Sequence, residues 1–159
     1  MGMQLIETIE VGSGGAASIE FTGIPQDGVD LVLVVSARSS SATQTQTIAF
    51  NASTAGFTGR QLLGTGSSVF SFADPVTLYA TPNYYTSNTF SSSELYISNY
   101  ASSANKSFSV NEVTEQNATA SDQLIQAGLW ANTAAITAVK LTMSYAQYST
   151  ASLYKITAD

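Results

Sequence analysis

The chain contains no cysteine and no histidine among its 159 residues. Without cysteine it can form neither a disulfide framework nor a thiolate metal site. Without histidine it lacks the usual general base of nucleophilic triads, the commonest transition-metal ligand and the side chain that normally titrates near neutral pH. These two absences remove the commonest routes to chemistry, so we expect no cofactor and no enzymatic activity.

Charged residues are also scarce, at 10% of the chain with a net charge of −6, against about 25% charged residues in a typical soluble domain. Serine and threonine are abundant and must supply the solvation that charges usually provide. Binding a phosphate backbone requires clustered cations, and we therefore expect no nucleic-acid partner. The basic residues are five and are scattered along the chain: Arg38, Arg60, Lys106, Lys140 and Lys155.

Long hydrophobic runs are missing as well. The longest aliphatic run is Leu31 to Val35, whereas about 20 apolar residues are needed to span a bilayer. The N-terminal MGMQLIE has neither the basic nor the apolar region of a secretory signal. We expect that the chain does not insert into a membrane and that it is synthesised in the cytoplasm. The length predicts one domain over residues 1–159, with residues 1–15 forming an N-terminal arm or an edge strand used in subunit contacts.

What the chain does have is a series of short alternating segments separated by turn residues such as Asp74 and Pro75. The clearest alternation lies within Phe90 to Tyr100, where Leu95 and Ile97 share one face. We count about ten such strands, and we find no convincing amphipathic helix. The pattern predicts an all-β fold, a jelly-roll-like antiparallel β-sandwich.

The stretch from Asp122 to Tyr145 contains two apolar strands around a short polar break. It predicts a hairpin or a corner at the middle of a sheet. In the first of these strands, alternation predicts that Ile125, Ala127 and Leu129 share a half-buried face. The only tryptophan, Trp130, falls at the bend, where it is either a lid over one end of the core or a contact for another molecule.

Catalytic patterns are weak in this sequence. There is no G-x-S-x-G motif, and a Ser–Lys dyad would have to use Lys106, Lys140 or Lys155 without a motif around any of them. A glycosidase needs two facing carboxylates, and no spacing among the glutamates selects a pair. A glycan-active enzyme therefore stays a third hypothesis, supported only by these candidates: Glu7, Glu10, Glu20, Glu94, Glu112 and Glu115.

Two groups of residues are candidates for binding. Apolar residues beyond those needed for one core predict contacts with other protein subunits: Leu5, Ile9, Val11, Leu31, Leu33 and Val35. Aromatic residues in or near polar segments predict an exposed binding surface, because such rings supply large contact area with few rotors: Tyr84, Tyr85, Tyr96, Tyr100 and Trp130.

Three blocks of the sequence are distinctive: IPQDGVDLVLVVSARSS, FSSSELYISNYASSANKSFSVNEVTEQNATA and QAGLWANTAAITAVKLTM. Together they resemble tailed-bacteriophage virion proteins, especially those of phages of marine bacteria and cyanobacteria. Proteins of this kind are called virion structural proteins, capsid decoration or cement proteins, or tail-fibre components. The resemblance implies a β-sandwich head on the particle exterior, often a homotrimer, and it implies no particular binding residues.

Taken together, these features favour a capsid decoration or cement protein on the virion exterior, acting as a homotrimer that bridges major capsid subunits. Such a protein gains strength from many weak contacts, and a low-charge surface suits packing among identical copies. The acidic balance suits an outer surface away from packaged DNA. The alternative is a tail-fibre or receptor-binding module in which the exposed aromatic rings contact host glycans.

Overall fold

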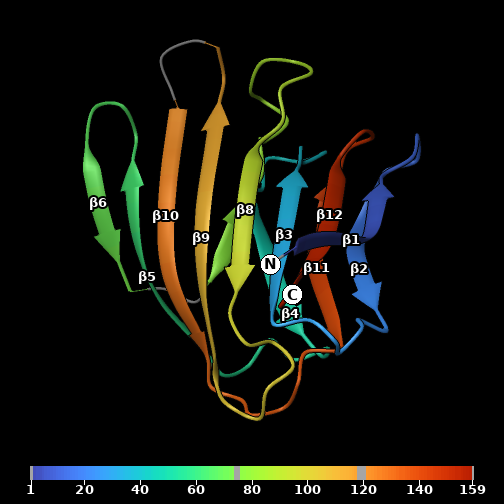
Figure 1. Ribbon diagram of the computed structural model, residues 1–159. Helices are drawn as coiled ribbons and strands as arrows, with labels where there is room; N and C mark the ends of the chain where they lie inside the picture. Colours follow the sequence, from blue (N-terminus) through green and yellow to red (C-terminus); the bar gives the residue numbers. More distant parts are fainter. Residues whose placement is uncertain (1, 74–75, 118–120, 159) are drawn as a thin grey trace.

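The computed structural model describes residues 2–73, 76–117 and 121–158, and within these ranges the chain forms strands, turns and loops without a helix (Figure 1). The turn expected at Asp74 and Pro75 lies outside the described residues. The strands are β1 (Gly2–Glu10), β2 (Ala16–Thr22), β3 (Asp30–Ser36), β4 (Thr45–Phe50), β5 (Phe57–Gly64), β6 (Val69–Phe72), β7 (Thr77–Tyr79), β8 (Ser92–Ile97), β9 (Lys106–Glu115), β10 (Ser121–Trp130), β11 (Ala138–Tyr145) and β12 (Thr150–Thr157).

The strands form two sheets, and each strand pairs antiparallel with its neighbours. One sheet has eight strands in the order β1-β12-β3-β8-β9-β10-β5-β6, and the other has four in the order β2-β11-β4-β7. The predicted all-β antiparallel sandwich is confirmed, with twelve strands instead of about ten.

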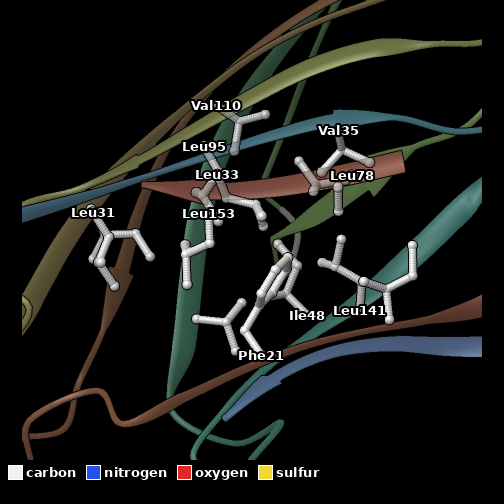
Figure 2. Packing of buried hydrophobic residues seen from close by; sticks show 14 of the residues in the cluster. Phe21, Leu31, Leu33, Val35, Ile48, Leu78, Leu95, Val110, Leu141 and Leu153 are labelled. Atoms are coloured by element: carbon white, nitrogen blue, oxygen red, sulfur yellow. The ribbon is translucent and has the colours of Figure 1, made fainter. Parts of the chain in front are cut away.

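The core forms because apolar residues recur with a period of two along the strands and face the opposite sheet. In β9 the buried and exposed residues alternate without exception over ten positions. Figure 2 shows Leu33, Leu95 and Leu153 of the large sheet facing Phe21 and Leu141 of the small sheet. This packing gives the eight-stranded sheet an inner face toward the small sheet and an outer face on the other side.

The two sheets differ in width, and this leaves part of the large sheet uncovered. The β5–β6 hairpin lies at one end of the large sheet, beyond the strands of the small sheet (Figure 1). All four residues of β6 are exposed. The inner side of this hairpin therefore has no second layer over its end.

The corner alternative is confirmed for the stretch around Trp130, because β10 belongs to the large sheet and β11 to the small one. The predicted buried face of β10 is wrong. Ile125 and Ala127 are exposed, and the buried side chains of this strand are Leu124, Gln126 and Trp130. Alternation alone misassigned the face because Gln126 is buried with hydrogen bonds, donating to Gln61 Oε1 at 2.9 Å and to the Thr77 carbonyl at 2.9 Å.

Four of the six apolar residues predicted for intermolecular contacts lie inside the sandwich. Leu31, Leu33, Val35 and Val11 are all buried in the core. The prediction is wrong for them. β3 lies within the large sheet and its odd-numbered side chains point to the small sheet, while Val11, just after β1, packs into the same core. The apolar residue of β3 that stays exposed is Val34, on the outer face.

The remaining two candidates lie on β1, which is an edge strand of the large sheet paired with β12. Leu5 is exposed, and Ile9 is half-buried against the core. Residues Gly2–Glu10 thus take the edge-strand form of the two forms expected for the N-terminal segment. Their use in subunit contacts stays a prediction.

Candidate binding surface

The exposed large apolar residues gather on the outer face of the eight-stranded sheet. Cross-strand partners share a face, so the register places each residue relative to Val34. Seven of the twelve exposed large hydrophobic residues lie on this side. We call these seven the outer apolar face: Met3, Leu5, Val34, Leu62, Val69, Val113 and Ile125.

The register shows how these residues cross the sheet. One row runs from Val34 through Glu94 and Asn111 to Ile125 and Leu62. The Glu94 carboxylate and the Asn111 amide separate Val34 from Ile125 and Leu62, so the face is neither fully apolar nor highly charged. This mixture is typical of protein contact surfaces, in which the apolar fraction is moderate and charge is depleted at the centre.

Two shallow hollows lie on the outer apolar face. One, of about 330 Å³, is lined by Arg60, Leu62, Ser71 and Ile125 among others. The other, of about 220 Å³, lies around Val34, Glu94, Asn111 and Val113. Both are open to solvent along strands, so they fit side chains of another protein surface better than an enclosed small molecule.

Few charges interrupt this face. Within the described strands, Arg60 and Glu94 carry the charges near its middle, and Glu10, Asp30 and Glu115 lie at strand ends. Asp30 is engaged locally, because its carboxylate accepts hydrogen bonds from the Tyr96 hydroxyl and, at 2.7 Å, from the Asn99 amide. Apolar contact with another surface would thus bury little unpaired charge.

The five predicted aromatic residues do not form one exposed surface, although the rings of Tyr84 and Tyr85 contact each other edge-on at 5.2 Å between centroids. Tyr84 is 64% exposed, and Tyr96 is half-buried. Tyr85, Tyr100 and Trp130 are buried, so the prediction of an exposed surface is wrong for these three. Trp130 is the lid over one end of the core: its Nε1 donates to the Ala55 carbonyl at 3.2 Å, and its ring packs edge-on against Phe50.

Tyr84 lies in a loop that is held by Arg38. The Arg38 guanidinium donates to the backbone carbonyls of Asn83, Tyr85, Thr86 and Thr89, at 2.9 to 3.0 Å. These four bonds tie residues 83–89 together, and no carboxylate of the described residues pairs with Arg38. The loop therefore presents the Tyr84 ring from a fixed backbone.

A second exposed tyrosine was not predicted. Tyr148 is 62% exposed in the turn between β11 and β12 and has a positive φ of 69°. Its amide donates to the Val11 carbonyl at 2.9 Å. Bulky residues adopt this backbone conformation rarely. The only signal in the sequence is an isolated tyrosine between polar residues, which does not distinguish an exposed ring from a buried one.

One carboxyl group is enclosed between the sheets. The side chain of Glu112 is buried on the inner face of β9, and neither carboxyl oxygen makes a hydrogen bond of ordinary geometry to the described residues. Burial raises the pKa of Glu112 well above its usual value and outweighs the Tyr79 backbone and the Ser93 hydroxyl, which act in the opposite direction. A substrate would not reach this carboxyl group, so its effect is on stability.

The lysines considered for a dyad are engaged by oxygen acceptors. Lys106 donates to the carbonyls of Ser102, at 2.8 Å, and of Ala104. Lys140 pairs with Glu20 at 3.0 Å and Lys155 with Asp27 at 2.6 Å. These contacts fix loops and strand edges and do not activate a serine.

Across residues 2–73, 76–117 and 121–158, no group of three or more Asp or Glu side chains is placed to hold a metal ion. Over the same residues, no helix is long and apolar enough to cross a membrane.

Comparisons with protein-family models, curated proteins and solved structures found no match to this chain.

Proposed function

We propose that this chain is a non-enzymatic structural protein of a phage virion, which decorates the capsid exterior by binding and bridging major capsid subunits. It would be made in the host cytoplasm and would act as a homo-oligomer, in the simplest case a trimer. The observation that carries this proposal is the outer apolar face, a broad and weakly charged surface with seven exposed large apolar residues. The resemblance of the three sequence blocks to virion proteins is the reason for placing this surface on a phage particle.

The face has the properties that lattice binding requires. Exposed apolar patches that are rimmed by polar residues mark protein–protein contacts. Each copy would bury only part of this face, so a single contact is weak, and repetition over a capsid raises the effective concentration of the next contact. The Ser- and Thr-rich composition keeps the isolated chain solvated before assembly.

The test uses two exposed valines with nearly equal exposure. Val34, at 38%, lies at the middle of the outer apolar face, and Val29, at 40%, lies before β3 and outside that face. We expect Val34→Lys to weaken binding to phage particles lacking the protein by at least about tenfold, because a charge enters an apolar contact. Val29→Lys should bind like the unmodified chain.

Binding is measured by co-sedimentation with these particles, after circular dichroism has shown that both variants fold. Equal binding of Val34→Lys and Val29→Lys would remove the outer apolar face from the proposal. Absence of binding by the unmodified chain would contradict capsid decoration itself.

One observation favours the alternative of a receptor-binding tail module: the exposed Tyr84 ring on the loop that Arg38 holds. Stacking on a sugar would depend on Tyr84, because three of the other predicted rings are buried and Tyr96 is half-buried. Copy number separates the two functions. Hundreds of copies per particle support head decoration, and a few tens, with binding of the isolated protein on a glycan array, support the tail module.

A further inference from the structure

The outermost strand of the projecting hairpin has the features of an unoccupied pairing edge. β6 ends the eight-stranded sheet, so one side of its backbone faces no other described strand of that sheet. Its residues, Val69, Phe70, Ser71 and Phe72, are uncharged and exposed. An apolar edge of this kind is a ready template for pairing with another strand.

The opposite edge of the same sheet carries the usual protections against pairing. β1 has a register shift between Leu5 and Glu7, and it carries both Glu7 and Glu10. A bulge twists an edge away from a partner, and charges make apposition costly. β6 has neither a register shift in its pairing with β5 nor a charged residue. Among the described residues of β6, the one protection against pairing is the short length of the strand, four residues.

We propose that β6 pairs antiparallel with β6 of a second copy of this chain, about a twofold axis at Ser71. In this register Phe70 of one copy lies opposite Phe72 of the other, and the two serines face each other at the axis. Phe70 and Phe72 already stack within one copy, with ring centroids 6.0 Å apart and planes 18° apart. Pairing extends the stack to four rings on the inner side of the joined sheet, where aromatic cross-strand pairs are favourable.

Charge favours a second copy of this chain as the occupant. The chain carries a net charge of −6, yet residues 57–72 contain a single charged residue, Arg60. A twofold contact repeats every charge that it contains, and this contact brings no acidic group against its own copy. The twofold geometry also uses the same edge on both copies, so it closes and leaves no further pairing edge at this site.

The size of the contact sets its strength. The seam, by which we mean the paired β6 strands, has four residues per copy and buries an area well below the ~1,200 Å² of a stable specific interface. The dimer should therefore form at high protein concentration and come apart on dilution. This inference is independent of the capsid proposal, because it concerns the isolated chain, whereas the trimer of that proposal would form on the particle.

Because the chain has no cysteine, one introduced thiol reports on the seam. At Ser71→Cys the two thiols lie opposite each other, with Cα atoms about 4.5 to 5.5 Å apart, within the range that a disulfide spans. We expect mild oxidation to give a disulfide-linked dimer as the main product. The matched control is Val69→Cys, at the more exposed end of the same strand.

In the proposed register, residue 69 lies opposite residue 73 of the other copy, so two thiols at position 69 would be about 13 Å apart. We expect Ser71→Cys to cross-link at least about tenfold faster than Val69→Cys. Equal cross-linking rates, or two monomeric products, would overturn the register and the proposal.

A second measurement needs no thiol. Sedimentation velocity should show a monomer–dimer equilibrium for the unmodified chain. Ser71→Lys should be monomeric, because two cations then meet at the axis. Ser109→Lys, on the exposed outer side of β9 in the same sheet, should dimerise normally. A monomer at all concentrations, or a dimer or trimer that Ser71→Lys leaves intact, would contradict the proposed seam. If Ser71→Lys fails to fold, the cross-linking comparison decides.

Discussion

At the scale of single residues, the most consequential side chain is Glu112. It occupies a position between the sheets that the alternation of β9 would assign to an apolar residue, next in the pattern after Phe108 and Val110. Burying a carboxylate without hydrogen-bond partners is costly. The folded state therefore favours the protonated form, and stability depends on pH.

We expect Glu112→Gln to raise stability at pH 7 to 8, by on the order of 1 kcal/mol. Burial raises the folded-state pKa of Glu112 above the ordinary value of 4.5. The folded chain holds the proton more tightly than the unfolded chain, so stability is greatest below that ordinary value and falls as the pH rises through the folded pKa. In Glu112→Gln this part of the fall should be absent.

The measurement is the melting temperature between pH 4 and 8. Glu94→Gln is the matched control, because Glu94 lies on the adjacent strand with its side chain exposed on the outer face. The same pH profile for both variants would contradict the role given to Glu112.

Gly128 illustrates a requirement at a single residue that the sequence does not predict. Gly128 lies on β10 directly opposite Phe108, and a Cβ atom there would come within 2.2 Å of the Phe108 ring. The sequence offers no sign of this, because the requirement comes from a ring on another strand. The same holds for the buried Gln126, whose partners lie on β5 and β7. Alternation predicts faces, and long-range partners decide the exceptions.

At the scale of elements, the loop held by Arg38 joins the small sheet to β8. The four carbonyl acceptors of Arg38 take the place that a salt bridge would normally fill. A guanidinium presents five donors in a planar fork, whereas an ammonium presents three donors from a single point. The loop therefore depends on arginine as such and not only on a positive charge.

We expect Arg38→Lys to loosen residues 82–90 and to leave the sheets unchanged. Loss of one or two hydrogen bonds should speed amide exchange in this loop by about tenfold, since about 1.4 kcal/mol corresponds to that factor. Hydrogen–deuterium exchange with mass spectrometry measures this. Arg60→Lys is the control, because the Arg60 side chain is exposed and donates to the adjacent Gly59 carbonyl. Unchanged exchange at residues 82–90 would contradict the role of Arg38.

Among the elements, strands with an unbroken apolar alternation were the predictable ones. Leu95 and Ile97 of β8 face the core as their pattern indicates. β3 is apolar on both sides, so its sequence could not tell the inward Leu33 from the outward Val34. For such a strand the deciding information is the strand order, which depends on partners far apart in the sequence.

At the scale of the whole molecule, both sheets contribute to one hydrophobic cluster that includes Trp130. The terminal strands are also tied together, because β1 pairs with β12. A shared core of this kind is expected to unfold in a single cooperative step. The class of fold was predictable from alternation and turn residues, whereas the division into eight and four strands was not, because short-range patterns do not specify which strands pair.

We expect fluorescence of Trp130 and far-ultraviolet circular dichroism to give the same urea midpoint, because the indole is buried between elements of both sheets. The indole is the only one in the chain, so its signal has a single origin. A fluorescence transition at clearly lower urea would show that one end of the sandwich opens separately.

The way Arg38 holds its loop has a consequence for how this protein can change over time. Every carbonyl that Arg38 contacts belongs to the main chain, and a main-chain carbonyl is present whatever side chain the position carries. Positions such as Tyr84 and Ser87, whose side chains are exposed, are therefore free to diversify while the loop keeps its shape. Changes at these two positions would alter what the loop contacts without refolding the sandwich, which makes them a practical place to introduce new binding side chains.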